Sequence, residues 1–328
     1  MVREGHIDVG VVGVGSMGRH HARVYDELPE ANLVGVSDVD EIRAAEVAAK
    51  HDVRAMGQAE LLRSVDAVSV VVPTQYHYET VTECLDATVA TFVEKPVLGS
   101  LERADELRSR VERADVPVQV GHIERFNPAV QALSDIVSDL SIVSVRSQRL
   151  GPPPRREIDD SAVLDLMIHD VDVVLALLDA ELESVQSAGV DANRHAAALL
   201  SFDDGTMASL TASRKTQRKV RTLEITAEEC FIELDYIDQS IEIHRNSVPE
   251  YIEDNGDVRF KHESIVERPQ ISTAEPLREE LESFVTVVDE HRVPEVTVED
   301  GLQALSVALE IEDGATETPV QPPVVGDD

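Results

Sequence analysis

The chain has 328 residues, of which 64 are Asp or Glu and 29 are Lys or Arg, so its formal charge is −35. This length allows one large domain or two ordinary ones, and a hydrophobic fraction of 42% is ample for a core. The negative charge argues against nucleic acid or an anionic membrane as a partner. The acidic residues are spread along the chain and only five residues are lysine. That pattern is typical of a halophilic protein, because concentrated salt screens the repulsion.

Cysteine content and hydropathy bear on the cellular compartment. Cys84 and Cys230 are too few for a disulfide framework, and neither belongs to a CxxC pair. The sequence has no apolar run long enough to span a bilayer and no signal-peptide pattern. We therefore expect a cytoplasmic protein with no membrane partner.

The first informative element is a glycine loop, Gly13-Val14-Gly15-Ser16-Met17-Gly18, between an apolar strand pattern and a helical pattern. Glycine lets the backbone approach a pyrophosphate, and the N–H groups of a helix N-terminus favour an anion. The next strand pattern ends in Asp38, where an acidic residue accepts hydrogen bonds from the adenosine ribose. A glycine turn followed by a solvent-facing Asp is the alternative.

Asp38 also predicts the cofactor. Its carboxylate would repel the 2′-phosphate of NADP, so NAD is favoured. Arg43, in the following helix, keeps NADP from being excluded.

Up to about His122 the patterns alternate between strand and helix, which predicts a Rossmann-type, doubly wound parallel sheet covered on both faces. The expected strands cover 8–12, 32–37, 67–72, 90–93 and 117–120. The expected helices cover 18–27, 41–51, 58–63, 78–87 and 101–113.

Beyond about residue 140 the strand patterns follow one another, which predicts an open, mostly antiparallel sheet with helices on one face. The expected strands cover 142–150, 183–190, 195–202, 206–213, 220–227, 231–236 and 240–244. The expected helices cover 161–178, 274–290 and 298–312. The predicted division is a dinucleotide-binding α/β domain at 1–122, an α+β substrate and oligomerisation domain at 123–316, and a disordered tail at 317–328.

Polar residues follow two strands at the carboxyl edge of the parallel sheet, where ligands of such folds bind. Pro73, Thr74 and His77 follow the third strand, and Glu94-Lys95 with a proline follow the fourth. In a chain with five lysines, a lysine at this edge indicates a functional site. A solvated surface lysine is the alternative.

Two further stretches carry candidate substrate residues. Arg125 and Asn127 lie at the predicted domain junction, where they would contact a ligand or form an interdomain ion pair. Asp165 and His169 are four residues apart and share one helix face, and Asp172 is placed to orient the imidazole. No other His or Cys cluster supports a metal ligand set, so we expect no metal.

These stretches together resemble the Gfo/Idh/MocA oxidoreductase family over nearly the whole chain. The resemblance rests on GVGSMG, Glu94-Lys95-Pro96, Arg125–Pro128, the Asp165/His169 helix and Pro294–Gly301. It implies hydride transfer between nicotinamide and a sugar or cyclitol carbon. Lys95 and His169 then act at the substrate hydroxyl, and Asp165 supports them.

The motifs GHIERFNP and DLMIHDVD also resemble those of the UDP-N-acetylglucosamine 3-dehydrogenase branch of the family. This predicts oxidation at C3 of that nucleotide sugar, with either His169 or Lys95 as the base. Arg125, Arg149, Arg155 and Arg156 are candidates for the diphosphate, by charge alone. The alternatives are a dehydrogenase of a free sugar or inositol, and a non-catalytic NAD-sensing regulator. The exposed sheet face predicts a homo-oligomer, a dimer or a tetramer.

Overall fold

The computed structural model describes residues 6–153, 161–246, 250–254, 257–261 and 263–316. By their contacts the described residues form two compact units. Unit 1 holds those up to Gln131 together with Ser272–Ser306, and unit 2 holds those from Ala132 to Ile271 and from Val307 onward. The predicted tail at 317–328 lies outside the described residues.

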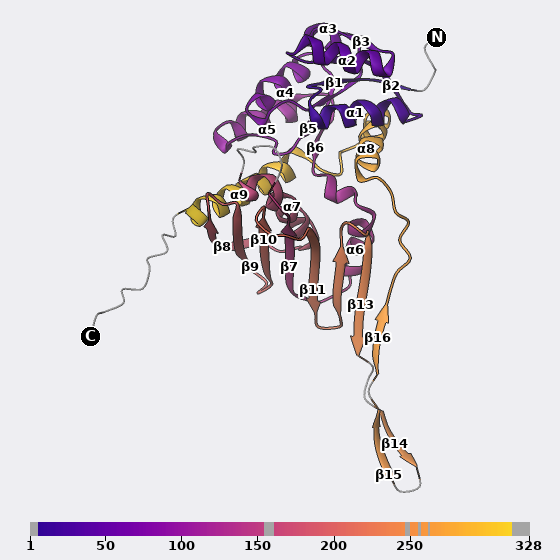
Figure 1. The fold of residues 1–328 in the computed structure, drawn as a ribbon, viewed down its shortest axis with the longest axis vertical. Coiled ribbons are helices and arrows are strands. Elements are labelled where there is room, and N and C mark those ends of the chain that lie inside the picture. The colour runs from indigo at the N-terminus through magenta and orange to yellow at the C-terminus, as the bar shows by residue number, and fades with distance from the viewer. Residues whose placement is uncertain (1–5, 154–160, 247–249, 255–256, 262, 317–328) are drawn as a thin grey trace, which may run out of the picture. The chain divides into compact units, whose positions relative to one another are not determined.

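Unit 1 contains a parallel six-stranded sheet in the order β3-β2-β1-β4-β5-β6, the doubly wound arrangement that the sequence predicts (Figure 1). The strands are β1 (Ile7–Val12), β2 (Ala31–Ser37), β3 (Arg54–Ala55), β4 (Ala67–Val70), β5 (Ala90–Glu94) and β6 (Val118–Gly121). The helices between them are α1 (Ser16–Glu27), α2 (Glu41–His51), α3 (Gln58–Leu62), α4 (His77–Asp86) and α5 (Ala104–Arg113). Short 3-10 turns occur at η1 (Thr74–Tyr76), η2 (Leu101–Arg103) and η3 (Ile123–Phe126).

Helix α8 (Pro276–Glu290) completes the core of unit 1, although it is far along the chain. Phe284 of α8 packs edge-on against Phe92 of β5, with the ring centroids 5.8 Å apart. The sequence pattern at 274–290 predicts this helix but assigns it to the second domain. Its contacts place it in unit 1, because an apolar face indicates burial without specifying the sheet that covers it. The predicted domain boundary at residue 122 stays a prediction.

Unit 2 contains an eight-stranded sheet in the order β16-β13-β12-β11-β7-β10-β9-β8 (Figure 1). All its pairs are antiparallel except the one between β7 and β10. The strands are β7 (Ile142–Leu150), β8 (Leu182–Val190), β9 (His195–Phe202), β10 (Met207–Ser213), β11 (Val220–Ala227), β12 (Phe231–Asp235), β13 (Ser240–Asn246) and β16 (Ser264–Glu267). Buried and exposed residues alternate along β9 and β10, so one face is covered and the other meets solvent.

Between β7 and β8, unit 2 contains a π-helical turn, η4 (Val163–Met167), which runs directly into α7 (Ile168–Leu177). Both η4 and α7 contact β10. The chain passes between the units three times: inside α6 (Pro128–Val137), between Ile271 and Ser272, and inside α9 (Val298–Thr316). The short strand β3, helix α6, strand β16 and the pair β14 (Glu250–Asp254) and β15 (Asp257–Lys261) were not predicted.

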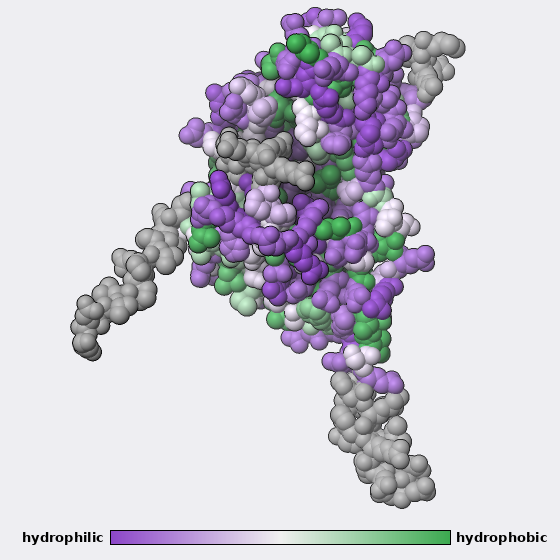
Figure 2. Space-filling view, viewed as in Figure 1, coloured by the Kyte–Doolittle hydropathy of each residue, from purple (hydrophilic) through white to green (hydrophobic). Residues whose placement is uncertain are grey.

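The surface agrees with the composition. In Figure 2 hydrophilic residues cover most of the visible face, and hydrophobic residues form small patches. None of the described helices is long and apolar enough to cross a membrane.

Candidate functional site

The glycine loop joins β1 to α1, and its backbone geometry requires glycine at two positions. Gly13 has a φ of +88°, and a Cβ there would lie 2.6 Å from the carbonyl oxygen of Val71. A Cβ on Gly18 would lie 1.9 Å from the carbonyl oxygen of Gly13. Both glycines are therefore needed to close the turn against β4 and to start the helix beneath it.

Gly15 differs, because a Cβ there would meet no described atom within 4 Å. The protein's own packing thus leaves open space where a dinucleotide phosphate would approach the backbone. Helix α1 begins at Ser16 with no side-chain cap and no acidic residue in its first turn. Its first N–H groups, including those of Ser16 and Met17, suit an anion. These features fit the pyrophosphate of a dinucleotide.

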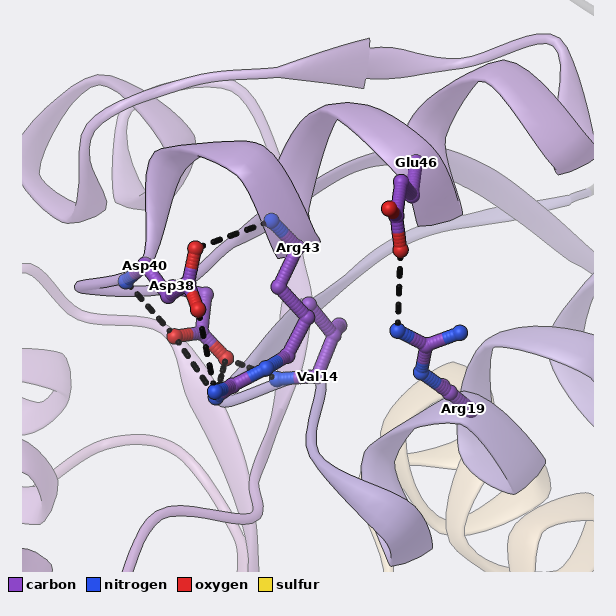
Figure 3. Close-up of polar contacts among 6 residues, drawn as sticks. All are labelled: Val14, Arg19, Asp38, Asp40, Arg43 and Glu46. Carbon is purple, nitrogen blue, oxygen red and sulfur yellow. Dashed lines mark hydrogen bonds and ion pairs between the residues drawn. The ribbon is translucent and has the colours of Figure 1, made fainter.

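Asp38 lies directly after β2 (Figure 3). Its side chain is only 4% exposed. Its Oδ2 accepts a hydrogen bond of 2.8 Å from the backbone N–H of Val14, and its Oδ1 accepts one of 2.9 Å from that of Asp40. The Arg43 guanidinium lies 3.3 Å from both carboxylate oxygens and 3.1 Å from Asp40. Asp38 therefore holds the glycine loop in place, and Arg43 lies over the predicted ribose position.

The loops after β4 and β5 are joined through His77. Its Nε2 lies 2.9 Å from the carbonyl oxygen of Val72, and its Nδ1 lies 2.9 Å from that of Pro96. Burial lowers the pKa of His77, so the ring is neutral near pH 7 and donates to only one carbonyl at a time. The ring thus contacts both loops and is hydrogen-bonded to one of them at a time. Exposed Pro73 and half-buried Thr74 lie on the loop after β4. Direct contact of these three residues with a cofactor stays a prediction.

Glu94, at the end of β5, is the last acceptor of a buried hydrogen-bonded chain. Its Oε1 lies 3.0 Å from Nε2 of His21, which is fully buried on α1. Nδ1 of His21 lies 3.1 Å from the hydroxyl of Ser69, which in turn lies 2.7 Å from the hydroxyl of Tyr25. Burial raises the pKa of Tyr25, so its hydroxyl stays protonated and can donate. A consistent set of donors then runs from Tyr25 through Ser69 to His21 and on to Glu94.

Lys95 is half-buried and follows Glu94 at the carboxyl edge of the sheet. Its backbone N–H donates to Oε2 of Glu94 at 3.3 Å, and the Lys95–Pro96 peptide is cis. Burial acts to raise the pKa of Glu94, but the hydrogen bond from His21 and the charge of Lys95 outweigh it, so this pKa is lowered. Glu94 is therefore a carboxylate that places a negative charge beside Lys95.

His122 follows β6 and is 1% exposed. Burial, together with the positive charges of Arg125 and Lys95, lowers the pKa of His122 to about 3. Arg125 lies 3.9 Å from Asp300, and both residues belong to unit 1. Asp300 also accepts hydrogen bonds from Thr297 at the start of α9. This ion pair lies within unit 1. Contact of Arg125 with a ligand and an interdomain ion pair both stay predictions.

Asn127 has a structural contact of its own. Its Oδ1 accepts a hydrogen bond of 3.1 Å from the backbone N–H of Ala129, and it is 2% exposed. It caps helix α6, which begins with proline at its first position. A role for Asn127 in substrate binding stays a prediction.

In unit 2 the predicted catalytic helix begins in the π-helical turn. Asp165 lies within η4 and forms an ion pair with Arg214, just after β10. His169 is half-buried and is the second residue of α7. π-Helical turns within helices occur frequently at functional sites, so this irregularity agrees with a ligand-contacting segment.

The side chain of Arg149 is 1% exposed, on β7. Its guanidinium pairs with both carboxylate oxygens of Asp170, at 2.9 Å each. Arg149 also lines a cavity of about 230 Å³ beside Asp165. Arg155 and Arg156 lie outside the described residues. Lys95 and His169 belong to different units, so their joint action on one hydroxyl stays a prediction.

Comparison with known proteins assigns the chain to a family. A family model described as "Oxidoreductase family, NAD-binding Rossmann fold" matches residues 7–122, and one described as "GFO/IDH/MocA C-terminal domain" matches 139–233. A UDP-N-acetylglucosamine 3-dehydrogenase of Acidithiobacillus ferrooxidans is 32% identical over 93% of this chain and 96% of that protein. The chain belongs to the Gfo/Idh/MocA oxidoreductase family.

Other members of the Gfo/Idh/MocA family show the same relationship. A solved structure of the A. ferrooxidans enzyme matches with a TM-score of 0.86, covering 94% of this chain and 97% of that one. The myo-inositol 2-dehydrogenase of Thermotoga maritima is 32% identical, over 55% of this chain and 58% of its own length. As a Gfo/Idh/MocA oxidoreductase, the chain binds NAD through the Rossmann domain that carries the glycine loop.

Sequence reasoning missed four residues that interact with predicted site residues: His21 and His122 in unit 1, and Asp170 and Arg214 in unit 2. His21 follows the glycine loop on the buried side of α1, and Asp170 lies in an apolar stretch beside His169. A charged or titratable residue on an apolar helix face is the signal that could have identified both. Arg214 offered no such signal, because its partner Asp165 is 49 residues away.

Proposed function

We propose that this oxidoreductase oxidises a secondary hydroxyl of a sugar, with C3 of UDP-N-acetylglucosamine as the best candidate. The observation that carries the proposal is the similarity to the A. ferrooxidans enzyme, which extends over 93% of this chain. Several inositol dehydrogenases match too. Three of similar identity cover little more than half of the chain, and the inositol 2-dehydrogenase of Rhizobium meliloti covers 91% of it at a lower identity of 26%. The site residues named above support oxidoreductase chemistry in general, but they do not distinguish one sugar substrate from another.

In the proposed reaction NAD supplies the hydride acceptor at the substrate carbon. His169 or Lys95 removes the hydroxyl proton, and the other residue donates a hydrogen bond to the same oxygen. Asp165 supports this site from the π-helical turn. The Glu94 carboxylate lies beside Lys95 and holds its backbone in place at the carboxyl edge of the sheet.

The test is a substrate panel with the full-length protein and NAD in molar KCl. UDP-N-acetylglucosamine, N-acetylglucosamine and myo-inositol are compared by kcat/KM from NAD reduction. We expect the nucleotide sugar to have the highest value, with a 3-keto nucleotide sugar as the product. A higher kcat/KM for the free sugar or for inositol would contradict the proposed substrate. Tight NAD binding without turnover of any substrate favours the NAD-sensing regulator. The homo-oligomer, a dimer or a tetramer, stays a prediction. Light scattering, which measures the mass of the protein in solution, tests it.

A further inference from the structure

The turn between β8 and β9, residues 191–194, has an unusual backbone. Asp191, Ala192 and Asn193 have φ angles of +57°, +52° and +55°, so three consecutive residues lie in the left-handed region. Residues with a Cβ adopt this region singly rather than in runs, because the Cβ crowds the backbone there. Strained backbone of this kind persists only where the surrounding structure holds it. The contacts of this left-handed turn therefore indicate what it does.

Asn193 connects the left-handed turn with two other segments of unit 2. Its carbonyl oxygen accepts a hydrogen bond of 2.9 Å from the backbone N–H of Ala162, directly before η4. Its Nδ2 donates one of 3.2 Å to the backbone carbonyl of Glu312 in α9. Asn193 is 2% exposed, and a Cβ on Gly189 of β8 would lie 2.0 Å from its Oδ1. The Asn193 side chain is therefore enclosed and has little room to move.

Glu312 also holds the start of η4. Its Oε2 accepts a hydrogen bond from the hydroxyl of Ser161. The hydroxyl oxygen of Ser161 accepts in turn from the backbone N–H groups of Val163 and Leu164, at 3.2 Å each. Ser161 thus satisfies N–H groups at the start of a helical segment, as a capping residue does. The beginning of η4 is therefore fixed by the left-handed turn and by α9 together.

The left-handed turn also contacts the segment that follows β10. The carbonyl oxygen of Arg194 accepts a hydrogen bond of 2.8 Å from the backbone N–H of Arg214. Asp191 forms an ion pair with Lys215, the next residue along the chain. Arg214 is the ion-pair partner of Asp165 in η4. Both members of the Asp165–Arg214 pair therefore lie on segments that are joined to one turn by backbone hydrogen bonds.

We propose that the left-handed turn positions the Asp165–Arg214 pair for the reaction, with Asn193 as the positioning residue. The inference rests on the proposed function, because Asp165 is a predicted residue of that site. The shape of the turn sets the distance between the two segments that it joins. A group misplaced by about 1 Å can lower the rate of an enzyme about 100-fold. Asparagine suits this place, because it adopts the left-handed region more readily than most residues with a Cβ.

Three variants and a control test the proposal. Asn193→Ala removes the side-chain amide and disfavours the left-handed φ, whereas Asn193→Gly removes the amide but permits that φ. Gly189→Ala keeps every group of Asn193 and displaces its Oδ1. Asp52→Ala is the matched control, because Asp52 has a φ of +54°, is exposed and ends α2 in unit 1.

The first measurement needs no substrate. Hydrogen exchange, followed by mass spectrometry of the full-length protein, reports on the amides of Ala162 and Arg214. We expect exchange in both segments to be about two- to ten-fold faster in Asn193→Ala and Gly189→Ala, the usual range for weakening one hydrogen bond. Asp52→Ala should leave it unchanged. Unchanged exchange in both Asn193→Ala and Gly189→Ala would overturn the proposal.

The second measurement is kcat with the best substrate of the panel, well below the thermal midpoint of each variant. Asn193→Ala should lower kcat about ten- to 100-fold, and Asn193→Gly should lower it less. The KM for NAD should stay unchanged, because the glycine loop belongs to unit 1. Faster exchange with an unchanged kcat would mean that the turn has a purely structural role, and it would also overturn the proposal.

A double-mutant cycle tests whether Asn193 acts through Asp165. In an Asp165→Asn background, Asn193→Ala should lower kcat far less than in the unmutated protein, because the group that it positions is already lost. An equal loss in both backgrounds would contradict the positioning role.

The two proposals fail separately. If UDP-N-acetylglucosamine is oxidised while Asn193→Ala changes neither exchange nor kcat, the positioning role is wrong and the function stands. If exchange rises as expected while no sugar is oxidised, the turn still positions the ion pair and the proposed function is wrong.

Discussion

Nε2 of His21 lies 3.0 Å from Oε1 of Glu94, so the helix that follows the glycine loop is joined to the strand that presents Lys95. The two residues are 73 positions apart, and both side chains are mostly shielded from solvent. One buried pair thus connects the cofactor-binding loop with a predicted catalytic residue. We regard His21 as a positioning residue, because it acts on Lys95 only through Glu94.

The first prediction concerns this buried pair. Glu94→Gln removes the negative charge beside Lys95, and we expect kcat to fall while the pH–rate profile moves to lower pH. His21→Asn should change kcat in the same direction. Tyr25→Phe removes only the far end of the hydrogen-bonded chain, so it should have a smaller effect. Lower activity with an unchanged pH profile in Glu94→Gln would indicate a purely structural role.

The second prediction concerns the catalytic pair. Lys95→Ala or His169→Ala should lower kcat by about 10²–10⁴-fold, the range for losing one acid–base group, with NAD affinity little changed. Steady-state kinetics with the best substrate of the panel, together with NAD titration, measures both quantities. Near-normal turnover in either variant would contradict the assigned role of that residue.

The third prediction concerns cofactor choice. Arg43→Ala removes the cation that lies over Asp38, so the preference for NAD over NADP, as a ratio of kcat/KM values, should rise. Asp38→Ser should lower that ratio, because the carboxylate that repels a 2′-phosphate is gone. Arg19→Ala is the control, since Arg19 pairs with Glu46 and does not contact Asp38 (Figure 3). A higher kcat/KM with NADP in the unmutated protein would contradict the prediction.

The fourth prediction concerns stability in acid. Because the pKa of His122 is lowered to about 3, the unfolded chain binds this proton between about pH 6.5 and 3 while the folded chain does not. As the pH is lowered through this window, the free energy of unfolding should therefore fall, by up to about 1.4 kcal/mol per pH unit from this group. The lowered pKa of His77 acts in the same direction.

His122→Asn should flatten the pH dependence of the thermal midpoint between about pH 6.5 and 5, where most carboxylates remain ionised. His20→Asn is the control, because His20 is exposed next to His21 on α1. Equal slopes in His122→Asn and the unmutated protein would mean that His122 does not contribute to the acid dependence.

The fifth prediction concerns salt. With a formal charge of −35, the folded chain repels itself at low ionic strength, and salt screens this repulsion. The thermal midpoint should therefore rise from low to molar KCl. A flat or falling midpoint would mean that the acidic surface has a cause other than a high-salt environment.

The sequence by itself determined the parallel α/β sheet, the glycine loop and most element bounds of both units. These features follow from local rules: apolar periodicity, glycine at a strand-to-helix turn and the acidic residue after the next strand. It also placed Lys95 at a carboxyl edge and Asp165 on a helix, because both positions depend only on neighbouring residues.

Only the tertiary structure decided which side chains meet. His21 with Glu94, Arg149 with Asp170, and Arg149 opposite Arg221 depend on strand order and register. A one-residue change in the register of a strand would move each of its side chains to the other face of the sheet. The register between distant strands cannot be read from a local pattern in the sequence. The same reason explains α8: its apolar face predicts a helix, but long-range packing against Phe92 decides that it belongs to unit 1.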